Sequence, residues 1–379
     1  MLYYGGSMKI RNGYTFALNR GIRIFFSEFV RVSLRRPAQA LFFGRTVLRQ
    51  LGAARRRAQL AREGLHVPPI AIFSITDRCN LRCKGCYAQA IRREGPEELS
   101  EEKMRGIVAE AAELGVSFFV IAGGEPLTRP AILDITRDFP QIIFLLITNG
   151  LLLDQSMIRR LVQQRNTVPV LSLEGTRVQT DERRGRGVHE ALERKMQELK
   201  SAGVFFSISL TVTRANFDVV TDEGFIQRAV AEGCRLFFFM EYTPIREGTD
   251  DWVITEGQRE GMRELVAGFR RRFPAVFVAV PWDEESTGGC LASGRGFVHI
   301  NASGDLEPCP FAPYSDTNLK KISLRQGLGS PFLAAMRDSH DGFAATEGGC
   351  ALWKRREQVR ELLASCTGAQ SSEGAERSA

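Results

Sequence analysis

The 379-residue sequence predicts an α/β fold built on a parallel sheet. Between residues 70 and 272, short apolar runs alternate with segments whose apolar residues recur at helical spacing. These runs are continuous rather than alternating, which is typical of strands buried on both faces of a parallel sheet. Periodicity leaves open whether the sheet is flat or curled into a barrel. The six expected strands are 71–76, 118–122, 144–148, 168–173, 205–212 and 236–242.

Capping residues mark the helices between these strands. Ser100 begins a helix that ends at Gly115, and Asp154 begins another. The side chains of serine and aspartate accept hydrogen bonds from the first turn of a helix, so they indicate where it starts. Further helix boundaries are expected near Gly203, Gly233 and Thr255. Strand and helix alternating in this way favour βα units joined by crossover connections.

The rhythm of strands and helices ends near residue 276. Residues 277–366 are rich in Gly, Pro and Cys, which indicates a second module. The residues from Thr367 onward are small and polar, and we expect them to be disordered. The expected divisions are therefore 1–68, 69–275, 276–366 and 367–379.

Residues 1–68 form a basic arm, with 13 Lys and Arg against two acids, Glu28 and Glu63. Pro37 separates two amphipathic segments in this arm, so we expect two helices. Amphipathic helices usually face a core, which favours packing of the arm on the barrel. An apolar face beside a cationic one also suits peripheral contact with an anionic membrane. No nucleic-acid reader motif is present, so nucleic acid is not an expected partner.

Composition excludes several classes of protein. Eight cysteines are too few for a disulfide scaffold in a chain of this length, and their clustering favours metal binding in a reducing compartment. The longest uninterrupted apolar runs, 142–147 and 275–280, are far shorter than the roughly 20 residues that span a bilayer. The N-terminus lacks the apolar segment of a secretory signal. We therefore expect a cytoplasmic protein, with membrane association through the arm as an open possibility.

Three cysteines follow the first expected strand within one short loop: Cys79, Cys83 and Cys86. A cubane cluster has four irons, so three thiolates leave one iron open to a small molecule. A structural zinc site usually has four ligands, and no fourth lies near this loop. The C-x3-C-x2-C spacing resembles the signature of the radical S-adenosylmethionine (radical SAM) superfamily.

That resemblance implies a partial (β/α)6 barrel and a radical mechanism. Enzymes of this family bind a [4Fe–4S] cluster and SAM, and one electron splits SAM into methionine and a 5′-deoxyadenosyl radical. The radical takes hydrogen from a substrate, here a peptide, a small molecule or a lipid. The electron would come from a reductant such as flavodoxin or ferredoxin. The alternative is an Fe–S electron-transfer or regulatory protein without turnover.

Further motifs resemble the SAM site of the family and weigh against that alternative. The second expected strand is followed by Gly-Gly-Glu-Pro, and in the family this motif binds the SAM amino group. The fourth strand ends in Ser-Leu-Glu-Gly, followed by a segment with an arginine that in the family holds the SAM carboxylate. Tyr87 follows the last cysteine, whereas the family often has an aromatic residue at the position of Gly85. The expected cofactor-binding residues are Gly123, Gly124, Glu125, Ser172, Arg184 and Tyr87.

A second group of cysteines lies in the C-terminal module. Cys290 and Cys309 flank an apolar strand, a turn at 303–305 and a return strand, which predicts a hairpin that brings the two thiols together. This pattern, with Cys350 following, resembles the twitch module of the family, related to the longer SPASM domain, and implies one auxiliary [4Fe–4S] cluster. The fourth ligand is either Cys366 or an open position, and Cys366 is equally well explained as a packed thiol.

Overall fold

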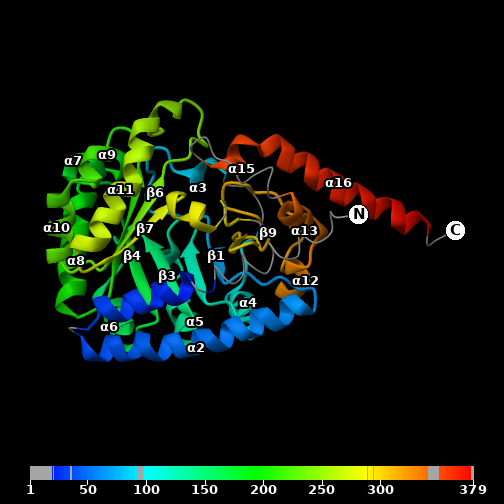
Figure 1. Ribbon diagram of the computed structural model, residues 1–379, viewed down its shortest axis with the longest axis horizontal. Coiled ribbons are helices and arrows are strands. Elements are labelled where there is room, and N and C mark those ends of the chain that lie inside the picture. Colours follow the sequence, from blue (N-terminus) through cyan, green and yellow to red (C-terminus); the bar gives the residue numbers. More distant parts are fainter. Residues whose placement is uncertain are drawn as a thin grey trace.

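The computed structural model (Figure 1) describes residues 19, 21–34, 36–91, 97–287, 289–292, 294–339 and 350–376. Its core is a nine-stranded sheet in the order β7-β6-β5-β4-β3-β2-β1-β8-β9. Neighbouring strands are parallel, except that β9 runs antiparallel to β8. The strands are β1 Ile70–Ser74, β2 Phe118–Ala122, β3 Ile143–Thr148, β4 Thr167–Leu173, β5 Ser207–Val212, β6 Leu236–Glu241, β7 Val276–Val280, β8 Phe297–Ile300 and β9 Leu306–Glu307.

The six expected strands are confirmed, and the parallel sheet extends further than the sequence indicated. β7 pairs with β6 and continues the sheet beyond the division expected at residue 276. This strand is followed by a short 3-10 helix, Trp282–Thr287, rather than by a long helix, so the βα rhythm gave no signal for it. β8 then joins the opposite edge of the sheet beside β1.

The helices begin at the capping residues that the sequence indicated. Ser100 caps α4, Glu101–Leu114, and Gly115 ends it in the left-handed conformation. Asp154 caps α6, Gln155–Gln164, and Thr255 caps α11, Glu256–Arg272. The other helices are α3 Tyr87–Ala90, α5 Ile132–Asp138, α7 Arg177–Arg184, α8 Val188–Ser201, α9 Phe217–Val220, α10 Glu223–Ala231, α12 Leu324–Leu328, α13 Pro331–Asp338, α15 Ala351–Lys354 and α16 Arg356–Glu376.

The two faces of the sheet belong to different apolar cores. Alternate residues of a strand point to opposite faces. Phe119 and Phe144 accordingly pack in the core that also contains Met104 of α4. Their neighbours Phe118 and Ile143 pack in a second core with the N-terminal arm. This burial on both faces explains the continuous apolar runs in the sequence.

The N-terminal arm covers the end of the sheet at which the strands begin. It forms a helix over residues 21–32 and α2, Pro37–Arg62, in blue along one edge of the molecule (Figure 1). Phe26 stacks on Phe118 with 4.7 Å between ring centroids, and Phe43 meets Phe205 at 5.2 Å. The buried Arg57 donates to the hydroxyl of Ser117 at 2.8 Å, just before β2. The expectation that the arm packs on the barrel is thus confirmed.

The C-terminal module is joined to the barrel through the predicted hairpin. β8 and β9 pair His299 with Glu307, and the turn between them contains Gly304 at a φ of 93°. A small apolar core that includes Phe332, Met336 and Leu352 supports the module. α16 continues past Thr367, where disorder was expected, since no proline interrupts residues 356–376. Within the described residues, no helix combines the length and the hydropathy needed to cross a bilayer.

Candidate functional site

The cysteine loop follows β1 and lies at the end of the sheet opposite the arm. Cys79 is exposed, Cys83 and Cys86 are half-buried, and all three are free thiols. Burial raises the pKa of Cys83, while the guanidinium of Arg184 opposes that rise. A nearby cation favours the thiolate, the form that binds iron. Figure 1 shows α3, directly after this loop, far from α2.

The loop after β2 is held tightly against the cysteine loop. The Gly124 N–H donates to the Thr76 carbonyl at 2.7 Å, and the Glu125 N–H donates to the Arg78 carbonyl at 2.8 Å. A Cβ at Gly123 would lie 2.3 Å from the Thr76 oxygen, and one at Gly124 would lie 2.2 Å from the Arg78 oxygen. Glycine is therefore required here for contact between the two loops, a role that the sequence did not indicate.

Glu125 is buried and its carboxylate is held by three donors. It accepts hydrogen bonds from the N–H of Leu127 at 3.0 Å, the hydroxyl of Thr148 at 2.8 Å and the N–H of Asn149 at 2.7 Å. Burial raises the pKa of Glu125, and these donors counteract the rise. The Asn149 side chain also donates to Asn80 of the cysteine loop at 2.8 Å. The turn after β3 thus positions both the carboxylate and the loop.

A buried carboxylate that sequence reasoning overlooked organises the end of β4. Glu174 is 1% exposed and accepts from Arg183 at 2.6 Å and from Arg184 at 2.5 Å. Ser172 lies two residues earlier, within β4, and is also buried. Burial lowers the pKa of Arg184, but Glu174 and the neighbouring Cys83 and Cys86 together raise that pKa above its usual value. The expected residue Arg184 is therefore brought to the cysteine loop, with Glu174 as its fixed partner.

Arg183 ties α7 to the cysteine loop. The Lys84 N–H donates to the Arg183 carbonyl at 2.8 Å, and the Arg183 Nε donates to the Lys84 carbonyl at 3.2 Å. Tyr87 lies on the other side of the loop, where its ring meets Phe311 edge to face at 5.1 Å. Tyr87 thus contacts the C-terminal module.

The second group of cysteines gathers in the core of the C-terminal module. Cys290, Cys309, Cys350 and Cys366 all belong to one apolar cluster. The Cys309 thiol donates to the sulfur of Cys350, which raises the pKa of Cys309 and lowers that of Cys350. The glycines at 348 and 349 lie outside the described residues.

Glu284 is a buried carboxyl group near this second group of cysteines, and sequence reasoning did not identify it. Burial raises its pKa to about 8, and Cys350 contributes to that rise. Glu284 follows β7 and belongs to no motif of recognisable spacing, so the sequence did not indicate it.

Both groups of cysteines have a donor set that suits an iron–sulfur cluster. Among the described residues, no three His, Cys, Asp or Glu side chains converge as ligands of a single metal ion would. A cubane cluster requires no such convergence, because each cysteine binds a different iron. Three free thiols in one loop, with arginines beside them, fit that requirement.

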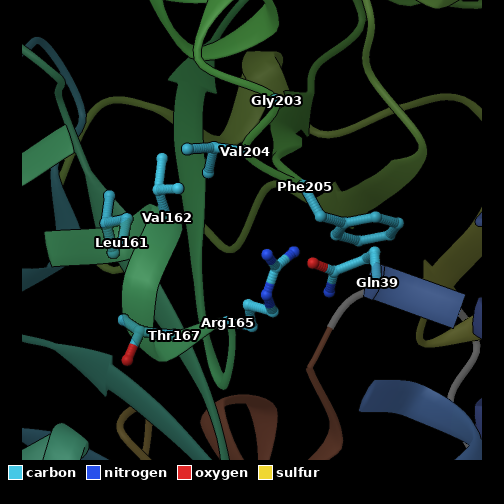
Figure 2. Close-up of a pocket in the computed structure, with 8 residues that line it drawn as sticks. All are labelled: Gln39, Leu161, Val162, Arg165, Thr167, Gly203, Val204 and Phe205. Carbon is cyan, nitrogen blue, oxygen red and sulfur yellow. The ribbon is translucent and has the colours of Figure 1, made fainter. Parts of the chain in front are cut away.

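A shallow hollow elsewhere on the molecule belongs to no part of this site. It lies between Gln39 of α2, the end of α6 and residues 203–205 (Figure 2). These segments precede β4 and β5, whereas the cysteine loop follows β1, so the hollow lies toward the opposite end of the sheet.

The comparisons with known proteins identify the family of the chain. Residues 73–226 match the model of the Radical SAM superfamily. The chain is 32% identical over 281 residues to a PqqA peptide cyclase of Granulibacter bethesdensis, covering 68% of this chain and 72% of that protein. It is 24% identical to an AdoMet-dependent heme synthase of Methanosarcina barkeri, covering 69% of this chain and 82% of the relative.

The fold is similar to that of a solved member. The Streptococcus suis SuiB structure with its precursor peptide SuiA superposes with a TM-score of 0.59 at 19% identity, covering 76% of this chain and 71% of that one. The sheet order and the cysteine loop after β1 are consistent with these matches. The chain belongs to the radical SAM superfamily and is an enzyme that uses a [4Fe–4S] cluster to cleave S-adenosylmethionine reductively and form a 5′-deoxyadenosyl radical.

Proposed function

We propose that Cys79, Cys83 and Cys86 hold the radical-forming cluster. The observation that carries this assignment is the position of three free thiols in a loop that is hydrogen-bonded to the Gly123–Glu125 turn and to α7. The bound cluster and SAM supply the radical chemistry. The protein residues position SAM and keep water from the site.

Each remaining motif has a role that follows from its contacts. The Glu125 carboxylate accepts a hydrogen bond from the SAM ammonium group, in addition to those from the donors that already hold it. Arg184 binds the SAM carboxylate, because Glu174 fixes its guanidinium through Nε and one Nη and leaves other N–H groups of the fork to donate. Ser172 lines the same pocket from β4.

The C-terminal module holds an auxiliary [4Fe–4S] cluster in this proposal. Cys290, Cys309 and Cys350 are three of its ligands, and the contact between Cys309 and Cys350 supports a shared site. Cys366 of α16 lies in the same apolar cluster and is the candidate fourth ligand. Residues 21–62 then form a helical arm, 69–280 the radical SAM barrel and 290–366 the auxiliary-cluster module.

A peptide is the proposed substrate class, on the names of two relatives with higher identity to this chain than the heme synthases have. Two relatives that are 32% identical to this chain are both named PqqA peptide cyclase. The substrate approaches the ends of the strands at the cysteine loop, where the buried Glu241 pairs with the half-buried Arg259 at 2.5 Å. A reductant of the flavodoxin or ferredoxin type supplies the electron.

The outer face of the arm supports peripheral contact with an anionic membrane. Five of the seven exposed large apolar side chains among the described residues lie there: Ile24, Leu34, Leu41, Leu48 and Leu51. α2 has no Asp or Glu, and the exposed Arg45 and Arg55 follow the same face as Leu41 and Leu48. An apolar and cationic surface of this kind is what binding to an anionic lipid surface requires.

Iron content and SAM cleavage together test the two clusters. Anaerobically reconstituted protein with dithionite should release 5′-deoxyadenosine and contain about eight irons per chain, as two [4Fe–4S] clusters require. Replacing Cys79, Cys83 and Cys86 by Ala should abolish cleavage and leave about four irons. Cys234→Ala is the control, because Cys234 is buried in the main core. Cleavage that persists in the triple variant would refute the radical site, and about four irons in the wild type would refute the auxiliary cluster.

A further inference from the structure

Two aromatic rings cover the backbone of Gly85, between the second and third cysteines of the loop. A Cβ at Gly85 would lie 2.7 Å from Cζ3 of Trp252 and 2.7 Å from the hydroxyl of Tyr242. Gly85 also has a φ of 64°, which a residue with a side chain rarely adopts. The space that a side chain at position 85 would occupy is therefore filled by rings from the segment between β6 and α11.

These rings are fixed by contacts on several sides. The ring centroids of Tyr242 and Trp252 lie 5.3 Å apart, and the Tyr242 hydroxyl donates a hydrogen bond to the Thr249 hydroxyl at 3.0 Å. The carbonyl of Trp252 accepts from the Arg214 N–H at 2.8 Å, which ties the end of the segment to the residues after β5. The Arg183 guanidinium lies 5.9 Å from the centre of the Tyr242 ring and also binds Glu174. One connected network therefore joins the aromatic pair, the cysteine loop and Arg184.

The two rings differ in what they can still contact. Tyr242 is 3% exposed, so protein covers both of its faces. Trp252 is half-buried, and its ring packs on Gly85 of the cysteine loop. A partly exposed indole offers a flat apolar surface of the kind on which purine bases stack.

The geometry points to Trp252 as the residue on which the adenine of SAM stacks, in place of an aromatic side chain within the cysteine loop. The inference rests on the proposed assignment of Cys79, Cys83 and Cys86 to the SAM-binding cluster. In this proposal Tyr87 packs edge to face on Phe311 of the C-terminal module and Trp252 takes the adenine. The adenosine pocket of this chain is thus completed by a segment about 165 residues away along the chain, between β6 and α11.

Ligands that contain different parts of SAM test this assignment. The full chain, reconstituted anaerobically, is compared as wild type, Trp252→Leu and Trp252→Phe, and binding of SAM, 5′-deoxyadenosine and L-methionine is measured by equilibrium dialysis. Trp252→Leu should weaken SAM and 5′-deoxyadenosine about ten-fold, the usual effect of losing one base–aromatic stack. L-Methionine has no adenine, so its affinity should not change. Trp252→Phe should retain most of the affinity for SAM.

Trp353→Leu is the matched control, because Trp353 lies in α15 and contacts Arg356. Equal weakening of L-methionine, or a loss of iron in Trp252→Leu, would show that Trp252 only supports the loop and would overturn the inference. Unchanged binding of 5′-deoxyadenosine to Trp252→Leu would also overturn the inference, even if this variant bound its substrate more weakly. Wild-type protein with full iron that binds no SAM would instead refute the proposed function.

Discussion

Arg183 and Arg184 are neighbours in α7 that share the carboxylate of Glu174 but contact different parts of the site. Arg183 also binds the Lys84 backbone of the cysteine loop, whereas the Arg184 guanidinium has the larger effect in lowering the pKa of the Cys83 thiol. Glu174 is almost fully buried, so it neutralises two cations that would otherwise lie next to each other with little solvent. In this arrangement Arg183 holds the cysteine loop, and Arg184 is the arginine proposed to bind SAM.

Lysine substitutions should separate those two roles. Arg184→Lys keeps the charge but loses the planar fork, so we expect about ten-fold weaker SAM binding with unchanged iron content. Arg183→Lys, its matched control, should lower iron content more than SAM affinity, because it loses the contact between Nε and Lys84. Iron analysis and equilibrium dialysis on the same preparations measure both effects. Identical behaviour of the two variants would contradict the separate roles.

At the scale of single elements, α2 is packed into the core of the barrel. Phe43 is fully buried and its ring lies near Phe29, Phe42 and Phe205. Leu41, Leu48 and Leu51 of the same helix are exposed, which explains why its amphipathic pattern fitted two functions.

Truncating Phe43 should therefore destabilise the whole protein. We expect Phe43→Ala to lower the free energy of unfolding by about 3 kcal/mol, as for other large core aromatics. Phe42→Ala is the control, since Phe42 lies on the same turn but is only half-buried, and its effect should be smaller. Chemical denaturation of the cluster-free protein measures both. A loss below about 1 kcal/mol in Phe43→Ala would mean that the arm is not part of the core.

For the whole molecule, the arm and the cysteine loop lie at opposite ends of the parallel sheet. The arm contacts residues before β2 and β5, and the loop follows β1. A membrane bound by the outer face of α2 would therefore leave the proposed active site directed away from the lipid. This geometry favours a substrate that arrives from the aqueous side, in line with a peptide.

Vesicle co-sedimentation tests that surface. Full-length protein should bind vesicles of phosphatidylserine and phosphatidylcholine at low salt and dissociate at high salt, because exposed charges are screened. Replacing Leu41 and Leu48 by Ser should abolish binding without altering the fold, since both side chains are more than half exposed. Val178→Ser is the control, with a side chain 69% exposed on α7. Binding to neutral vesicles alone, or no binding at all, would contradict membrane contact through the arm.

The sequence by itself determined the parallel α/β sheet, the capped helices and the three-cysteine loop after β1, because these features depend on local spacing. Continuous apolar runs require burial on both faces, and Ser100, Asp154 and Thr255 cap helices through contacts within one turn. Only the tertiary structure decided the features that depend on distant residues. The pairing of Glu174 with two arginines, the place of β7 in the sheet, the packing of α2 and the rings over Gly85 all join segments far apart in the chain. No spacing in the sequence reports such contacts, since they arise only when distant segments meet in the folded protein.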